Sequence, residues 1–188
     1  MKSWQRNLIR LVSLLIVFWS VGFALPSTAH VERDIIINAP PAEVYELISD
    51  FKQWGQWSPW ARLDPEVELA ISGSGLGQTM MWASDNPQVG SGQQEIIELE
   101  RDRQLKTHIE FDGQGVANAT FELTAALNET DGVVTKGTKV VWSLDSTVND
   151  KAPFFFKPIN NYFGLLLDSL VGKDYETGLA NIKQIAEN

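Results

Sequence analysis

The chain has 188 residues, enough for one domain with a real hydrophobic core, and it contains no cysteine and only two histidines, His30 and His108. These counts exclude a disulfide framework and a thiolate metal site, and they leave little for a zinc site or a Ser-His catalytic unit. Residues 30–188 carry 24 acidic and 12 basic side chains, a net charge of −12. Because such a body would repel phosphate backbones, we expect no nucleic-acid partner.

Residues 1–29 have the composition of a membrane signal. Three basic side chains, Lys2, Arg6 and Arg10, lie within the first ten positions. Apart from Arg10 near its start, the stretch Leu8–Leu25 is almost wholly apolar, and it is about as long as the minimum span of a bilayer. Small residues before and at Ala29 would also allow cleavage there, so a retained anchor and a cleaved signal peptide both fit. In both cases the basic end predicts that residues 30–188 lie on the extracytoplasmic (periplasmic) side.

The first part of the domain predicts a strand, a helix and an aromatic segment. Val31–Ile37 (VERDIII) has a strand pattern, and NAPPAEVYELISDF follows with a proline pair and then apolar residues at helical spacing. Trp54, Trp57 and Trp60 come next, three residues apart and interrupted by glycine and proline. We interpret them either as an aromatic plug packed against a sheet or as one rim of a hydrophobic pocket.

From Glu66 onward the pattern is that of short strands. About six segments alternate polar and apolar residues, and glycine, asparagine and aspartate turn signals separate them. Gly73, Gly75 and Gly77 resemble part of a nucleotide fingerprint. They join two strands and no helix follows, so we interpret them as turn positions. Tight turns between short strands favour an antiparallel meander.

The chain ends in one long amphipathic helix, predicted over about Pro158–Glu187. Its apolar positions recur at about 100° per residue, over about seven or eight turns. Three glycines interrupt it, each at a cost of up to about 1 kcal/mol, which suggests that something approaches the helix closely. Asp174 and Asn181 lie within the apolar stripe. They either face water and cap neighbouring backbone, or they point into a cavity.

These elements predict an α+β fold, a curved antiparallel sheet of about six or seven strands around the final helix, preceded by an N-terminal hydrophobic helix. Apolar residues two apart, including the pair Ile97 and Leu99, would face the helix. A sheet curved around a helix can leave a concave apolar space where small molecules bind. The expected ligand-binding residues are Trp60, Met80, Trp82, Phe111, Phe121, Trp142, Phe163, Leu167, Asp174, Gly178 and Asn181. A core filled by side chains is the alternative.

Four stretches resemble one known family. VERDIIINAPPAEVYELISDFKQWGQWSPW, GLGQTMMWASDNPQVGSGQQEI, GTKVVWSL and LVGKDYETGLANIKQIAE occur in order over Val31–Glu187. They resemble the SRPBCC superfamily in its polyketide cyclase/dehydrase-like (START-like) branch. The resemblance implies a helix-grip fold with a hydrophobic cavity between sheet and C-terminal helix. That superfamily includes lipid carriers, cyclases and purely binding members, and the shared glycines, prolines and tryptophans carry no catalytic signature.

Three functions follow as hypotheses. The first is a non-enzymatic module that binds an apolar or lipid-like small molecule near the membrane, with Asp174 or Asn181 orienting a polar head group. The second is a cyclase or dehydratase in which a desolvated Asp174 has a raised pKa and acts as acid or base. The third is a structural or protein-interaction domain with a filled core, which exposed tryptophans at 54, 57 and 60 would favour. We expect no metal, no cofactor and no catalytic residue, and the sequence leaves the oligomeric state open.

Overall fold

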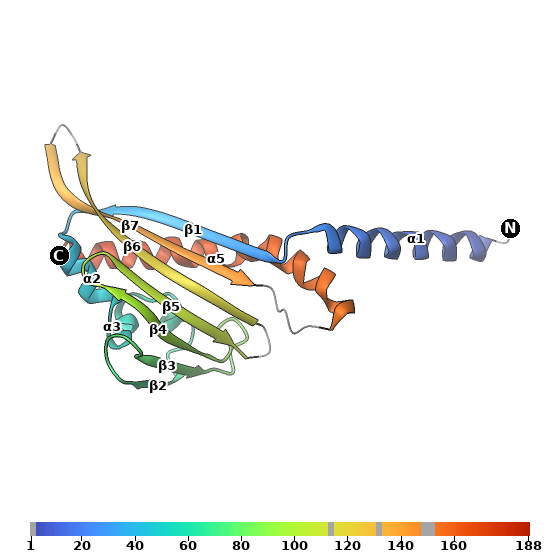
Figure 1. Ribbon diagram of the computed structural model, residues 1–188, viewed down its shortest axis with the longest axis horizontal. Helices are drawn as coiled ribbons and strands as arrows, with labels where there is room; N and C mark the ends of the chain where they lie inside the picture. The colour runs from blue at the N-terminus through green and yellow to red at the C-terminus, as the bar shows by residue number, and fades with distance from the viewer. Residues whose placement is uncertain (1–2, 113–114, 131–132, 148–152) are drawn as a thin grey trace.

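A computed structural model describes residues 3–112, 115–130, 133–147 and 153–188, and Figure 1 shows its arrangement. The helices are α1 (Ser3–Ala24), α2 (Pro41–Ile48), α3 (Phe51–Trp57), α4 (Trp60–Leu63) and α5 (Lys157–Ala186), with a short 3₁₀ turn, η1 (Phe154–Phe156), just before α5. The strands are β1 (Thr28–Ile37), β2 (Glu68–Ser72), β3 (Thr79–Ala83), β4 (Gly92–Glu100), β5 (Gln104–Phe111), β6 (Gly115–Thr130) and β7 (Val133–Thr147).

The strands form one antiparallel sheet in the order β1-β7-β6-β5-β4-β3-β2. The six strands from β2 onward follow chain order across the sheet, and β1 closes the row by pairing with β7. Helix α5 runs along the concave side of the curved sheet, next to β1 and β7 (Figure 1). The predicted fold, a curved sheet around a long C-terminal helix, is confirmed.

Strict alternation along the central strands builds the core. In β6 and β7, Phe121 and Leu123 pair with Trp142 and Val140, and all four side chains are buried beneath the helices. Helices α2 and α3 cover one end of the concave face with their own buried side chains, Val44, Tyr45, Ile48, Phe51, Trp54 and Trp57. The tryptophan segment therefore packs as an aromatic plug against the sheet.

Strand β4 departs from the predicted alternation. A β-bulge lies between Ile96 and Glu98, and a bulge inserts one extra residue that shifts all later side chains to the other face. Ile96 is therefore fully buried, while Ile97 is 43% exposed. The prediction that Ile97 faces the helix together with Leu99 is wrong, because the alternation does not continue through the bulge.

Helix α1 extends away from the domain (Figure 1) and is almost wholly exposed. By length and composition it is long and apolar enough to cross a membrane. Only its last turns touch the domain, where Gly22 is buried against the start of α5. The chain enters β1 at Thr28, four residues after α1 ends.

Candidate functional site

An aromatic cluster occupies the centre of the space between the sheet and the second half of α5. The indole ring of Trp142 is stacked between Tyr175 of α5, with ring centroids 3.7 Å apart, and Phe121 of β6, 4.6 Å away. Trp57 and Trp60 meet the same indole edge-on. Three predicted site residues, Trp60, Phe121 and Trp142, are thus brought together. In this part of the concave face, aromatic rings fill the space.

The glycines of α5 make room for side chains of the sheet. A Cβ atom at Gly178 would lie 2.8 Å from Cζ3 of Trp142, closer than real Cβ contacts come. A Cβ atom at Gly172 would collide with the guanidinium of Arg33. Close approach of side chains from the sheet therefore accounts for both glycines. Gly178 lies directly against the Trp142 ring of the aromatic cluster.

Asp174 and Asn181 both bind the tryptophan segment. The Asn181 amide donates a hydrogen bond to the backbone carbonyl of Trp57, 2.8 Å away, and the Trp60 indole interacts with the Asp174 carboxylate. Burial raises the pKa of Asp174 above its ordinary value, and the hydrogen bond from Trp60 and the charge of Lys173 only partly oppose this effect. The two residues hold α3 and α4 against α5, and they also place two polar groups beside the aromatic cluster.

The indole nitrogen of Trp142 is buried without a partner. Among the described residues, it is the one buried side-chain polar atom that lacks a hydrogen bond. A buried donor left unsatisfied costs about 1–3 kcal/mol, so a water or a polar atom of a bound molecule would stabilise the protein here. Burial also raises the pKa of the neighbouring Tyr175 far above its ordinary value, so that its hydroxyl stays protonated.

The other end of the concave face is open. Strand register places Leu69, Met80, Trp82 and Phe111 on the side of the sheet that faces α5. We call these four residues the open end. The rings of Trp82 and Phe111 meet edge-to-face at 6.0 Å, yet Leu69 is 51% and Phe111 is 37% exposed. Apolar surface therefore remains uncovered where the aromatic cluster stops.

The two remaining predicted residues lie on the first half of α5. Leu167 is partly buried against the core, and Phe163 is 60% exposed. The predicted site residues thus form a filled group under the second half of α5, an open group on strands β3 and β5, and a third group on the first half of α5. No single closed cavity brings all of them together in the described structure.

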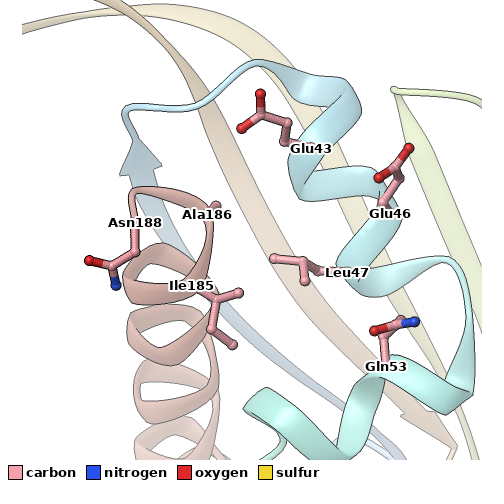
Figure 2. Close-up of a pocket in the computed structure, with 7 residues that line it drawn as sticks. All are labelled: Glu43, Glu46, Leu47, Gln53, Ile185, Ala186 and Asn188. Carbon is pink, nitrogen blue, oxygen red and sulfur yellow. The ribbon is translucent and has the colours of Figure 1, made fainter.

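Two pockets on the protein surface both differ from the predicted space between sheet and helix. The larger, of about 680 Å³, lies at the ends of β2–β5 and includes Trp82 and Phe111. It also includes Met81, Gln93 and Glu110, whose side chains alternate to the outer face of the sheet. The smaller, of about 340 Å³, lies between α2, α3 and the end of α5 (Figure 2). None of the predicted residues lines it.

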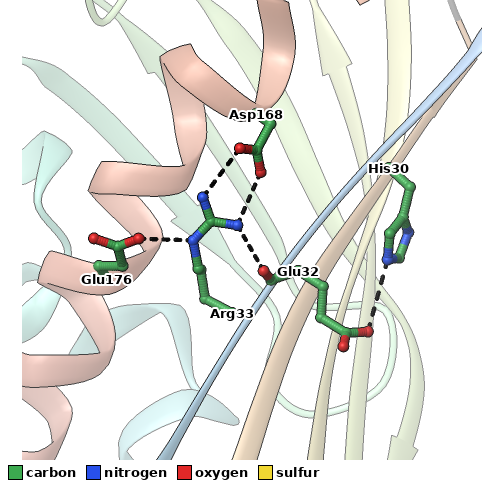
Figure 3. Close-up of polar contacts among 5 residues, drawn as sticks. All are labelled: His30, Glu32, Arg33, Asp168 and Glu176. Carbon is green, nitrogen blue, oxygen red and sulfur yellow. Dashed lines mark hydrogen bonds and ion pairs between the residues drawn. The ribbon is translucent and has the colours of Figure 1, made fainter. Parts of the chain in front are cut away.

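Arg33 was missed by sequence analysis. Its guanidinium points from β1 toward α5 and binds the Asp168 carboxylate through two nitrogens, at 2.8 and 3.2 Å, and Glu176 through a third at 2.8 Å (Figure 3). A fourth contact reaches the backbone carbonyl of Glu32. Because the Arg33 guanidinium binds both carboxylates, it holds α5 against β1, the edge strand of the sheet. Its sequence signal is an arginine at an inward position of a strand.

Within the described ranges, no group of three or more histidine and acidic side chains could hold a metal ion. The family model for polyketide cyclase/dehydrase and lipid transport matches residues 28–187. No curated protein matches the chain.

Solved structures share the fold at low identity. The Zhui aromatase/cyclase from Streptomyces sp. R1128 is 16% identical, with a TM-score of 0.60 over 85% of this chain and 94% of that one. A protein of unknown function, SA2116 from Staphylococcus aureus, is 15% identical, with a TM-score of 0.58 over 86% and 97%. Truncated norcoclaurine synthase from Thalictrum flavum is 14% identical, with a TM-score of 0.56 over 84% and 92%.

Proposed function

Because the chain belongs to the polyketide cyclase/dehydrase and lipid transport family, we propose that it binds a hydrophobic, lipid-like small molecule between the concave face of its sheet and α5. The proposal places this domain outside the cytoplasmic membrane, tethered by α1. The observation that carries it is the open end, where Leu69 and Phe111 expose apolar surface on the face that the helix should cover. Covering such surface with an apolar ligand would contribute about 25 cal/mol per Å².

The proposed binding region has two different ends, the apolar open end and the aromatic cluster. An apolar ligand on the open end would meet the rings of Trp82 and Phe111 along its length, and its far end would approach the cluster. The unpartnered indole N–H of Trp142 and the carboxyl of Asp174 are polar groups that belong to, or lie beside, this cluster. A few polar groups at one end of an apolar site fix the orientation of a ligand, so we expect an amphipathic molecule.

Native mass spectrometry of the full-length protein, released from membranes in mild detergent, tests the proposal. We expect a small-molecule adduct that disappears on denaturation and that Phe111→Asp abolishes, because the variant places a charge on the apolar surface. Ile97→Asp is the matched control, since Ile97 is exposed on β4 but does not face the helix and does not line the pocket that contains Phe111. Equal adducts in the two variants would rule out the open end as the binding surface.

A second candidate function is supported by the raised pKa of Asp174. A carboxyl whose pKa is raised by burial beside an apolar surface suits acid–base chemistry on a bound substrate, such as loss of water in a dehydratase. Asp174→Asn should then keep binding but stop turnover, and the adduct should become heavier by one water molecule. An unchanged adduct mass in this variant would favour the binding module.

The third hypothesis, a protein-interaction domain, would have been favoured by exposed tryptophans at positions 54, 57 and 60. Trp54 and Trp57 are buried in the core, and Trp60 is partly covered by Trp142 and Tyr175. The tryptophan segment therefore offers no exposed aromatic surface to a partner protein.

A further inference from the structure

An apolar surface surrounds the start of α5. Its members share high exposure, between 53% and 68%, and they are the six side chains Phe154, Phe155, Phe156, Phe163, Leu165 and Leu166. We call this surface the apolar foot. Between Phe154 and Leu166 the chain carries one charged residue, Lys157. A cluster of exposed aromatic and leucine side chains of this kind marks an interaction site.

The apolar foot is joined to the end of α1. The Asn161 amide donates hydrogen bonds to the backbone carbonyls of Gly22 and Leu25, at 3.0 and 3.3 Å. The Tyr162 hydroxyl donates to the carbonyl of Phe18 at 3.0 Å, and the two rings stack at 4.6 Å. Phe154 and Phe23 also stack. These contacts fix the level at which α5 begins relative to α1.

The start of α5 lies beside α1 before α1 ends, at the position of Phe18. Its 22 residues extend about 33 Å at 1.5 Å per residue, close to the thickness of a bilayer core, about 30 Å. Phe18 precedes the last residue of the helix, Ala24, by six positions, which corresponds to about 9 Å along the axis. If α1 crosses a bilayer, the start of α5 therefore lies below the surface of the hydrocarbon.

The net charge of the domain indicates that the apolar foot would contact a membrane through apolar rather than electrostatic interactions. Residues 30–188 have a net charge of −12, which repels anionic lipid head groups. The apolar foot has one cation and six exposed apolar side chains, and aromatic rings are favoured at the membrane interface. The occupant that fits it is the acyl-chain region of a bilayer.

We propose that the apolar foot inserts into the extracytoplasmic leaflet of the same bilayer that α1 spans, so that α5 begins inside the membrane. The domain is then held by a spanning helix and by a second, monotopic contact. This inference rests on the membrane location included in the proposed function, and it is independent of ligand binding, which mass spectrometry reads separately.

The absence of cysteine permits a clean test with single-cysteine variants of the full-length protein. Phe155→Cys and Leu166→Cys report the apolar foot, Leu14→Cys reports the middle of α1, and Leu127→Cys is the control. Leu127 is 69% exposed, like Phe155 at 68%, but lies on the β6–β7 hairpin at the end of the molecule away from α1 (Figure 1). All four side chains are exposed, so the substitutions leave packing intact.

Each variant is labelled with the fluorophore NBD and reconstituted into phosphatidylcholine vesicles with or without doxyl-labelled phosphatidylcholine. We expect several-fold stronger quenching at positions 155 and 166 than at 127, approaching that at 14. Quenching at 14 with positions 155 and 166 no different from 127 would overturn the inserted foot and leave the anchor standing. Absence of quenching at 14 would overturn both.

Discussion

Glycine in the middle of a helix is destabilising, and the two glycines in the second half of α5 are explained by the side chains that face them. The Trp142 ring edge occupies the space where a Cβ of Gly178 would be, and Trp142 cannot retreat because Tyr175 and Phe121 stack on its two faces. Gly55 in α3 provides a contrast, since no atom lies within 4 Å of the position of its Cβ.

We therefore expect Gly178→Ala to lower the free energy of unfolding by about 1–2 kcal/mol, because overpacking costs about 1–3 kcal/mol and the helix propensity of alanine returns up to about 1 kcal/mol. Gly55→Ala, the matched control, should be neutral or stabilising. Urea unfolding of the full-length protein in detergent, followed by tryptophan fluorescence, measures both. A Gly178→Ala variant as stable as Gly55→Ala would contradict the tight contact with Trp142.

For individual residues, some positions of the candidate site could be predicted from the sequence and others could not. Alternation correctly identified Phe121 and Trp142 as inward-facing, because the β6–β7 pairing is regular. It misplaced Ile97, because a bulge leaves no unambiguous trace in the sequence. Tyr175 escaped notice because its hydroxyl excluded it from an apolar stripe, although its ring stacks on Trp142 at the centre of the core.

Between elements, an ion pair joins α5 to the edge strand β1. Arg33 is the inward-facing cation of β1, and it binds the carboxylates of Asp168 and Glu176, which lie about two turns apart on α5. The hydrogen bonds from Arg33 lower the pKa of Asp168 below its ordinary value of 3.8. A carboxyl with a lowered pKa in the folded state stabilises the fold above its unfolded pKa, and this contribution is lost as the pH falls through the folded value.

Arg33→Gln should accordingly lower the unfolding temperature at neutral pH. The difference from the wild type should shrink as the pH falls below about 4, the pKa of an aspartate in the unfolded chain, and should disappear below the lowered folded pKa of Asp168. Lys139→Gln is the control. It breaks the Lys139–Asp34 pair at 3.4 Å, whose side chains are about half exposed, and exposed pairs contribute little. Thermal unfolding by circular dichroism between pH 7 and pH 3 compares the three proteins. A difference independent of pH would show that Arg33 acts through packing rather than through Asp168.

Across the whole molecule, the order of elements and the architecture could be predicted because length, periodicity and turn signals agree along the chain. The fate of the N-terminal segment could not, since a signal peptide and an anchor share the same composition. The structure adds what composition lacks, namely contacts between α1 and the distant helix α5. Asn161 is buried, and its amide has the carbonyls of Gly22 and Leu25 as acceptors.

Cleavage after Ala29 would damage the fold at two places, and we therefore expect α1 to be retained. It would remove Thr28 and Ala29 from β1, where they pair with Thr147 and Ser146, and it would remove both hydrogen-bond acceptors of the Asn161 amide. The intact mass of the protein purified from membranes should correspond to a chain that still contains residues 1–29. Ala29→Leu, which removes the small residue at the cleavage position, should leave that mass unchanged apart from the substitution. A mature chain beginning at His30 in the wild type, together with an uncleaved Ala29→Leu variant, would show instead that residues 1–29 are a signal peptide and that the contacts of α1 with α5 are absent from the mature protein.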